Sequence, residues 1–396
     1  MGTDSIPRLT LEFAIPAIAG MLVNGAYNII DSIFLGQAIG PIGQASMTAA
    51  NPIMIVFMGI SMLVGVGGNA LSALRLGEGD REAAERSLGN TVTLSLIIWA
   101  VVAVLAFVPL TINALLSLSS ATPEVWANAR IFIQIISAGF IFQCIGLGVN
   151  NFIRTAGEPN RALGTMVVGA VVCIALNYLF VMVLGWGIVG SALATVAGQL
   201  VSCLCVLWYF CLTPGVPLKL HLHYMPLRAK VVRMILTLGL ASFLLQVGAA
   251  ALNFVLNAML VKYGSMHPLG ADNALASIGV VSRIGMFAVF PLIGMAIAVQ
   301  PLLGFNYGAR LFDRVRKTLL CGVVGATAIA VLMWALIHLF PVQIVSAFGI
   351  RDTDLRDFTV FALQVQLMLL PFVGFQIVCS NYFQATGQPA KSIFLT

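Results

Sequence analysis

Ten long apolar segments dominate this chain, and they constrain its fold more than any other feature. About 20 predominantly apolar residues suffice for an α-helix to cross the hydrocarbon core of a bilayer. Sixty per cent of the residues are apolar and only 9% are charged, against roughly half and a quarter in an ordinary soluble domain. We therefore expect an all-α polytopic membrane protein with spans at residues 9–36, 47–75, 88–116, 129–154, 161–184, 187–212, 233–261, 274–304, 318–342 and 357–386.

The basic residues are concentrated in every second loop. The N-terminal tail and the even-numbered loops carry most of them, whereas the odd-numbered loops carry only Arg130, Lys262, Arg351 and Arg356. Cytoplasmic loops of membrane proteins are enriched in Lys and Arg, so this asymmetry predicts a multi-pass protein of a prokaryotic plasma membrane with a cytoplasmic N-terminus. It also explains the net charge of +6 without a nucleic-acid partner.

Two junctions recur along the chain with one displacement. The stretch from Asn151 to Pro159 resembles residues 381–389, and Gly77 with the following Asp80 resembles Gly308 with Asp313. Duplicated halves are common in secondary transporters. We expect two six-helix bundles: a first lobe at residues 1–215, a cytoplasmic linker at 216–232, and a second lobe at 233–396. Because two full halves need about 460 residues, the second lobe should contain helices 7–10 and the start of helix 11, as a fragment or as a natural short form.

Asp31 is the one acid of the chain that lies well inside an apolar segment. An ionisable group in lipid costs about 2.5–3.5 kcal/mol on insertion scales, so it is a functional candidate. Asn24, Tyr27 and Asn28 precede it at helical spacing and share its face. Pro16, fifteen residues earlier, should kink this helix. We interpret the stripe as a proton or cation site; the alternative is an interfacial Asp31 stabilised by Asn28.

Uncharged polar residues also lie within the later segments. Asn150, Asn177, Thr195 and Gln199 occupy spans four to six. They either hold helices together by hydrogen bonds or meet Asp31 in one cavity, and both interpretations remain open.

The second half offers a weaker set of polar residues. Arg283 lies near the middle of its segment, where it would pair with a carbonyl or a helix end, attract an anionic group, or repel cations. Asn253 and Asn257 share a helix face. These three residues are candidates for a second-lobe cavity.

Other chemistries have little support. His221 and His223 have no third ligand nearby, and the seven cysteines lie inside apolar segments without CxxC spacing, so we expect no metal site and no cofactor. The acids between Glu78 and Glu85 are the only candidates for the magnesium site of an intramembrane enzyme, and we interpret them as a solvated helix start.

Three motifs together resemble the multidrug and toxic compound extrusion family, the MATE transporters. They are the ten residues from Gln300 to Ala309, the stretch from Leu76 to Asp80, and the stretch from Arg154 to Pro159. The resemblance extends from the first span to the end of the chain. It implies a V-shaped pump of two six-helix lobes, a monomer that exports small cationic amphipathic compounds in exchange for protons or sodium.

The resemblance to the DinF-like branch also implies site residues. Asp31 matches an Asp on the first helix, with Asn24, Tyr27 and Pro16 at the family's spacing. The second Asp of that branch falls on Asn177, which is a departure.

Further site residues follow from the same resemblance: Asn150 and Thr195 occupy positions near the Asn177 site. The function expected is therefore antiport in which the proton and the exported cation compete for Asp31, and protonation bends the first helix at Pro16. A lipid-linked oligosaccharide flippase of the same superfamily is the alternative, although such a protein needs several cavity arginines and only Arg283 is available.

Overall fold

The computed structural model describes residues 2–39, 41–109, 113, 123–264, 266, 270–347 and 353–395. Within these ranges the chain forms helices and short turns, without a strand. Ten helical stretches are long and apolar enough to cross a bilayer, and they correspond to the ten predicted spans. The predicted all-α polytopic fold is therefore confirmed.

Most spans are single helices, and three are interrupted. The fourth span changes from α5 to α6 through a π-helical turn at Cys144–Val149, the fifth ends in a second π-helical turn at Tyr178–Val183, and the tenth breaks between α13 and α14. The helices are α1 (Ile6–Ile39), α2 (Pro41–Gly77), α3 (Arg81–Phe107), α5 (Pro123–Gln143), α6 (Asn150–Thr155), α7 (Pro159–Asn177), α8 (Gly187–Leu212), α9 (Ala229–Gly264), α10 (Gly270–Gly308), α11 (Phe312–Leu339), α12 (Pro341–Ala347), α13 (Thr353–Gln366), α14 (Leu370–Ala385) and α15 (Pro389–Leu395).

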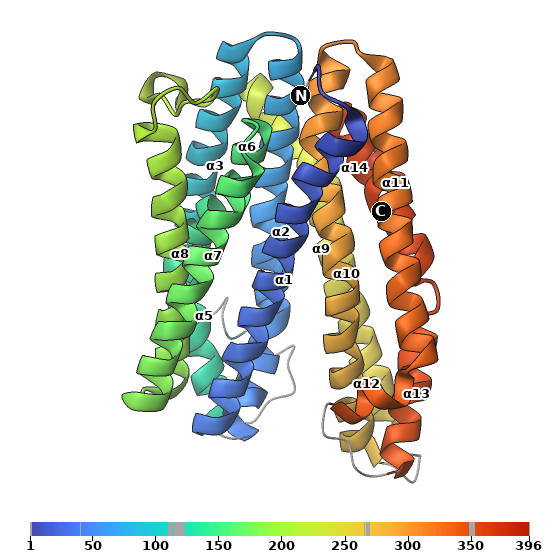
Figure 1. The fold of residues 1–396 in the computed structure, drawn as a ribbon. Coiled ribbons are helices and arrows are strands. Elements are labelled where there is room, and N and C mark those ends of the chain that lie inside the picture. The colour runs from blue at the N-terminus through green and yellow to red at the C-terminus, as the bar shows by residue number, and fades with distance from the viewer. Residues whose placement is uncertain are drawn as a thin grey trace.

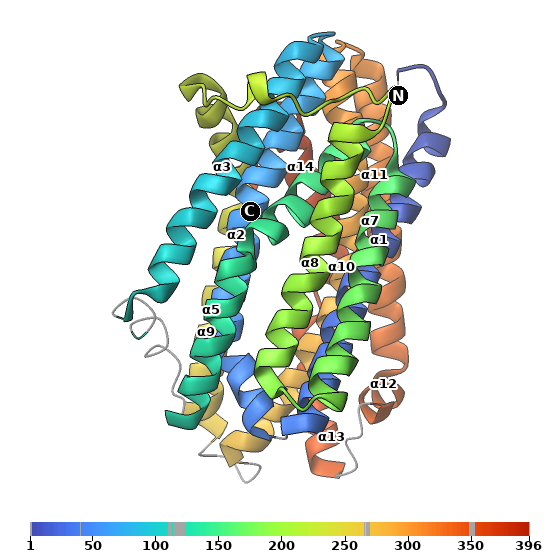
Figure 2. The ribbon, with the colours of Figure 1, turned by 90° about the vertical axis from the view of Figure 1, so that its left-hand side faces the viewer.

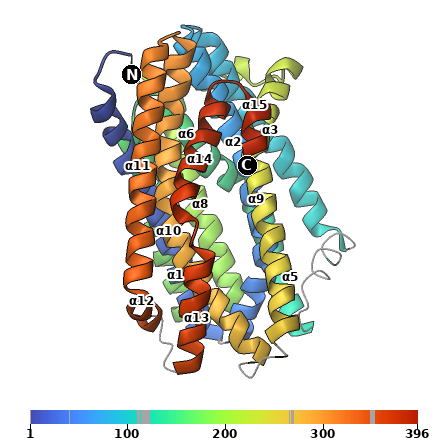
Figure 3. The ribbon, with the colours of Figure 1, turned by 90° about the vertical axis from the view of Figure 1, so that its right-hand side faces the viewer.

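The helices form two groups that diverge towards one end (Figure 1). Helices α1–α8 make up the first group, seen from its own side in Figure 2, and α9–α15 make up the second, seen in Figure 3. The groups meet along α1, α2, α9 and α10. The N-terminus and the α2–α3 and α10–α11 connections lie at the same end of the molecule.

The duplicated junctions fold into the same turns. Gly157 and Gly387 both have positive φ, 93° and 76°. The amide of each following residue donates to the carbonyl five residues back, at 3.1 Å for Glu158 and 2.8 Å for Gln388. This arrangement is a helix C-cap for which glycine is favoured. The sequence repeat is thus also a structural repeat.

The two groups approach each other closely at the end that carries the N-terminus. A Cβ atom added to Gly77 would lie 2.0 Å from the carbonyl oxygen of Phe305, and one added to Gly308 would lie 2.1 Å from that of Leu74. Each glycine is therefore needed for backbone contact. We call this contact of α2 with α10 the glycine seam.

Helix α1 contributes to both groups. Its first half places Leu9, Phe13 and Ala17 in an apolar core with residues of α10, α11 and α14. Its second half also contacts α7, where a Cβ added to Gly20 would lie 3.1 Å from Sδ of Met166, and it stays against α10, where a Cβ added to Gly25 would lie 2.6 Å from Phe290. Pro16 is buried, and α1 continues through it.

The segment between the two groups is fastened to α3. Asn90 is fully buried and donates to the carbonyl oxygen of Tyr224 at 3.1 Å, while its own oxygen accepts the amide of Arg228 at 2.9 Å. The carboxylate of Glu85 accepts the amide of Lys219 at 3.1 Å. Helix α9 begins at Ala229, within the predicted linker.

Candidate functional site

Asp31 is buried in the first lobe, with 7% of its surface exposed. The side-chain amide of Asn177 and the hydroxyl of Ser191 both donate to Oδ1 of Asp31, the latter at 2.7 Å. These three residues come from α1, the end of α7 and the start of α8. The structure thus joins Asp31 to Asn177, the position at which the resemblance places a second Asp.

Close packing of α7 against α8 fixes the two donors. A Cβ added to Gly198 would lie 2.6 Å from Cβ of Cys173, and one added to Gly190 would lie 3.0 Å from Phe180. The π-helical turn begins directly after Asn177, and such turns in helices are frequent at functional sites. Small residues on α8 therefore let α7 lie close enough to present Asn177 to α1.

Further polar groups lie along α7 and α8 towards the end with the N-terminus. Thr195 hydrogen-bonds Cys173, one turn from Asn177. The side-chain oxygens of Gln199 and Gln143 are buried, and among the described residues neither has a hydrogen-bond partner. These groups make the interior of the first lobe rich in acceptors.

Two residues of the predicted stripe on α1 keep their place beside Asp31. Asn24 and Tyr27 are half-buried, and each of them has an interaction partner. The side chain of Asn28 lies outside the described part of the structure.

The structure does not bring Asn150 to Asp31. Its amide donates to the carbonyl of Ala162 at 3.1 Å and to the hydroxyl of Thr165 at 2.5 Å, and its oxygen accepts from Arg154 at 2.9 Å. These partners surround the α6–α7 turn. In this structure Asn150 joins α6 to α7.

Arg154, the last residue of the fourth predicted span, is buried, with 3% exposure. Its guanidinium donates to the side-chain oxygens of Asn150 and Asn151, at 2.9 and 2.8 Å. A basic residue at a helix end looks like any other loop residue in a sequence, so the burial of Arg154 was missed. The two adjacent asparagines, three and four residues before it, are the signal that would have indicated it.

Ser191 was missed as well. It lies one turn before Thr195 on α8, so the helical spacing from a predicted site residue would have found it.

The second-lobe candidates do not form a comparable cluster. Arg283 is exposed on α10. Asn253 is exposed on α9, where its amide donates to the carbonyl of Ala249 in its own helix at 2.8 Å. The side chain of Asn257 lies outside the described residues. The buried polar cluster that the structure describes around an acid is therefore in the first lobe.

The acids after α2 behave as a helix start. Oδ1 of Asp80 caps α3 by accepting the amide of Ala83 at 2.9 Å. Glu82 and Glu85 pair with Arg86 and Arg81 in the same helix, at 2.6 and 3.0 Å. The interpretation of these acids as a solvated helix start fits the cap at Asp80, but Glu85 is an exception, because it is buried with 6% exposure and accepts the amide of Lys219.

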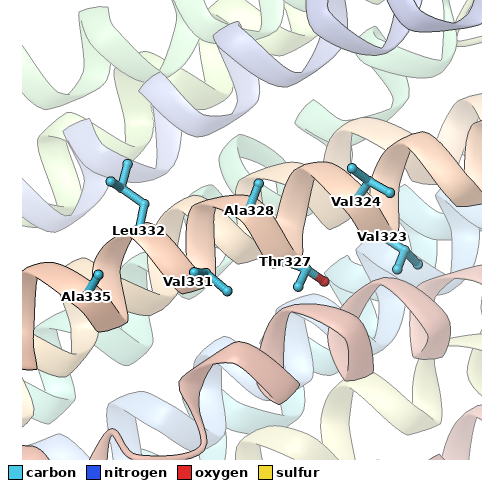
Figure 4. Close-up of a pocket in the computed structure, with 7 residues that line it drawn as sticks. All are labelled: Val323, Val324, Thr327, Ala328, Val331, Leu332 and Ala335. Carbon is cyan, nitrogen blue, oxygen red and sulfur yellow. The ribbon is translucent and has the colours of Figure 1, made fainter.

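A groove of about 690 Å³ runs along α11 and is shown in Figure 4. Thr327 is the polar residue among the seven that line it; the others are Val323, Val324, Ala328, Val331, Leu332 and Ala335. Its apolar character suits contact with acyl chains. It lies in the second lobe and contains no charged group for a cation.

Polar residues of the two lobes also bind each other at the level of the glycine seam. The amide of Asn69 on α2 donates to the oxygen of Gln300 on α10 at 3.2 Å, and Thr155 donates to the oxygen of Asn69 at 2.7 Å. Asn69 and Gln300 occupy corresponding places in the two halves, 231 residues apart.

Comparisons with known proteins agree with this arrangement. Multidrug export protein MepA of Staphylococcus saprophyticus is 25% identical over 392 residues, which cover 97% of this chain and 83% of MepA. The structure of the MATE multidrug transporter DinF-BH superposes with a TM-score of 0.90 at 34% identity, covering 100% of this chain and 86% of that one. The outward-facing conformation of a multidrug resistance MATE family transporter superposes with a TM-score of 0.90 at 26% identity, covering 99% and 85%.

The MatE family model matches residues 16–179 and 242–396. These ranges include α7 with Asn177, the glycine seam and both duplicated helix caps. The resemblance expected from the sequence is confirmed, and the chain belongs to the MatE family of multidrug efflux transporters.

Proposed function

We propose that this protein is a secondary active transporter that exports small cationic amphipathic compounds in exchange for protons. Export of drugs is named for MepA and for the structurally similar transporters. The observation that supports a proton as the coupling ion is the burial of Asp31 between Asn177 and Ser191. A buried carboxylate with hydrogen-bonding neighbours can accept either a proton or an organic cation.

Competition for one carboxylate gives obligatory exchange. When Asp31 is charged it attracts the cationic compound, and when it is protonated the attraction is lost and the compound leaves. One proton moving through 100 mV releases about 2.3 kcal/mol, and tenfold accumulation of a compound costs about 1.4 kcal/mol. A single titrating Asp31 is therefore sufficient for export against a gradient.

Helix α1 is well placed to transmit this change. Asp31 binds α7 and α8 of the first lobe, whereas Leu9, Phe13 and Ala17 at the other end of α1 pack into the second lobe. A change of charge at Asp31 alters the contacts of α1 with the first lobe only. Bending at Pro16 would then move the two lobes relative to each other and alternate the access of the cavity.

The orientation follows from the basic residues. Arg75, Arg81 and Arg314 lie in the helix turns next to the α2–α3 and α10–α11 connections, and Arg310 lies within the second of these, at the end that carries the N-terminus. Under the positive-inside rule this end faces the cytoplasm of a prokaryotic cell. The transporter works as a monomer, with no cofactor beyond the coupling ion.

The test is export from proteoliposomes with the pH gradient and the sodium gradient imposed separately. Purified wild-type protein should expel ethidium when only the pH gradient is present, and the Asp31→Asn variant should not. Both proteins should elute alike on size exclusion, which shows that the variant is folded. Undiminished proton-driven export by Asp31→Asn, or export that needs the sodium gradient alone, would contradict the proposal.

A further inference from the structure

The pair of side-chain amides that joins the two lobes buries one donor without a partner. The amide of Asn69 on α2 donates to Oε1 of Gln300 on α10 at 3.2 Å, and the oxygen of Asn69 accepts the hydroxyl of Thr155 at 2.7 Å. All three residues are buried, with 1% exposure for Asn69 and Gln300 and 3% for Thr155. Nε2 of Gln300 is buried too, and it has no hydrogen-bond partner among the described residues. The contact between the lobes is therefore bonded on one side only.

A difference between the two repeats accounts for this imbalance. Asn69 and Gln300 occupy corresponding places in the two halves, 231 residues apart. Thr155 precedes the positive-φ glycine of the first repeated cap by two residues, and Ala385 holds the equivalent place in the second. A Cβ added to Gly304, one turn after Gln300, would lie 3.5 Å from the carbonyl oxygen of Ala385, so Ala385 lies against this part of α10. Because alanine has no hydroxyl, Gln300 lacks on its side the kind of partner that Asn69 has in Thr155.

The amide pair lies at the inner edge of the glycine seam. Asn69 precedes Gly77 by about two helical turns, which is about 12 Å along α2. Between them, a Cβ added to Gly304 would lie 2.9 Å from Cβ of Ala73, so α2 and α10 stay in contact from the seam to the amide pair. The two groups of helices diverge from this end towards the other (Figure 1). Any separation of α2 from α10 at the end with the N-terminus therefore has to break the bond between Asn69 and Gln300.

We propose that Asn69 and Gln300 form the latch of the cytoplasmic gate, and that the unsatisfied donor of Gln300 keeps this latch weak enough to open in every transport cycle. This inference rests on the proposed alternation of access. In the closed gate, the bond between the two side chains holds α2 against α10, while Nε2 of Gln300 is buried without an acceptor. When the lobes separate, water reaches both amides, and this donor gains a partner.

The bond and the unsatisfied donor act in opposite directions on the gate. A buried neutral hydrogen bond favours the closed state about twofold to tenfold, and a buried donor without a partner disfavours it about fivefold to a hundredfold. The close packing of Gly77 and Gly308 adds to the stability of the closed state. The amide pair therefore sets the position of α2 against α10 without locking the gate, which lets a modest driving force open it.

Supplying the missing partner is the sharpest test. Ala385→Ser places a hydroxyl, which can accept from Nε2 of Gln300, at the position equivalent to Thr155. The closed gate should become more favourable, because the serine removes a cost that the closed state alone bears. In a cysteine-free background, a cysteine at Ala73 should react about fivefold to tenfold more slowly with an impermeant maleimide from the cytoplasmic side. The maximal rate of proton-driven ethidium export should also fall several-fold. Ala326→Ser, at a buried alanine of the same apolar cluster, is the matched control.

Removing the acceptor should have the opposite effect. Gln300→Ala leaves the amide of Asn69 without its bond in the closed gate, whereas the open gate loses only a hydrated side chain. The cysteine at Ala73 should then react several-fold faster. Gln366→Ala, the same change at an exposed position of α13, is the matched control. A general loss of stability would speed labelling in both variants, so slower labelling in Ala385→Ser together with faster labelling in Gln300→Ala identifies a latch.

The outcomes separate the latch from the proposed function. If Ala385→Ser is labelled as fast as Ala326→Ser, or if Gln300→Ala is labelled as slowly as Gln366→Ala, the latch is overturned. Variants are compared only when they elute alike on size exclusion, and should one of them not fold, the other decides with its own control. If the unaltered protein expels no ethidium under a pH gradient, the proposed function fails, while the labelling rates still report on the latch because they need no transported compound.

Discussion

At the scale of single residues, Asp31 and Arg154 are two buried ionisable groups of the first lobe with different surroundings. Asp31 accepts hydrogen bonds on Oδ1 from two neutral donors, Asn177 and Ser191. Arg154 is held on two sides by the oxygens of Asn150 and Asn151. Both partners are neutral amide oxygens, which accept hydrogen bonds from the charged guanidinium. We therefore interpret Arg154 as a permanently charged structural residue that stabilises the α6–α7 turn.

Replacing Arg154 with methionine should destabilise the protein. The substitution removes the donor from two buried oxygens, and each lost bond costs about 1–3 kcal/mol. The midpoint of thermal unfolding in detergent should therefore fall by several degrees. Arg161→Met is the control, because the Arg161 side chain is 54% exposed and pairs with Glu158 on the surface, where ion pairs contribute about 0–1 kcal/mol. Equal midpoints for the two variants would show that Arg154 is not a structural cation.

At the scale of elements, α1 differs from its neighbours because it belongs to both cores. A helix that packs on two bodies must bend, slide or rotate when those bodies move apart. Pro16 lacks the amide hydrogen that would bond one turn back, so α1 is weakest there. Contacts with α10 continue beyond Pro16, at Ile18 and Gly25, so a bend at Pro16 would also change these contacts.

Pro16→Ala should separate binding from transport. Alanine restores the missing backbone bond and stiffens α1, whereas Asp31 and its partners remain. We expect ethidium binding by purified protein to be kept and proton-driven export to fall several-fold. Pro159→Ala is the control, since Pro159 opens α7, where proline is favoured and no helix bond is lost. If both variants export at the wild-type rate, α1 does not bend at Pro16 during transport.

The sequence predicted correctly those features that depend on a single helix or turn. Ten spans, the duplicated caps and Asp31 could all be recognised, because span length, Gly–Pro spacing and an acid in an apolar run are local signals. The contact of Asp31 with Ser191 and the burial of Arg154 were not recognised. They depend on which faces of α1, α7 and α8 meet, and a single helix does not specify its neighbour. Asn150 shows the same limit, since its polarity gave no indication that it bonds Arg154.

At the scale of the whole molecule, the duplication defines the contact between the lobes. Gly77 touches the backbone of Phe305, and its counterpart Gly308 touches that of Leu74. The paired amides of Asn69 and Gln300 lie across the same contact. A protein of two similar halves closes one end by matching each half to the other. In this structure the seam closes the end that carries the N-terminus.

Gly77→Val should open this seam. The new side chain would meet the carbonyl of Phe305, so the close approach of α2 to α10 becomes unfavourable. We expect ethidium export to fall, and a cysteine introduced at the buried position of Ala73 to react several-fold faster with an impermeant maleimide from the cytoplasmic side, in a cysteine-free background. Gly164→Val is the control, because a Cβ there meets no atom within 4 Å. Unchanged labelling in Gly77→Val would mean that the seam does not close the pathway.

The fastening of the connecting segment to α3 determines where the lobes can pivot. Asn90 and Glu85 bind the backbone of this segment at Tyr224, Arg228 and Lys219. The connecting segment therefore moves together with the first lobe. This attachment does not stop where α9 begins, because Ile235 and Leu238 of α9 pack with Val64 and Leu71 of α2. A movement of the second lobe therefore has to bend or displace α9 beyond these contacts, and the connecting segment itself stays with the first lobe.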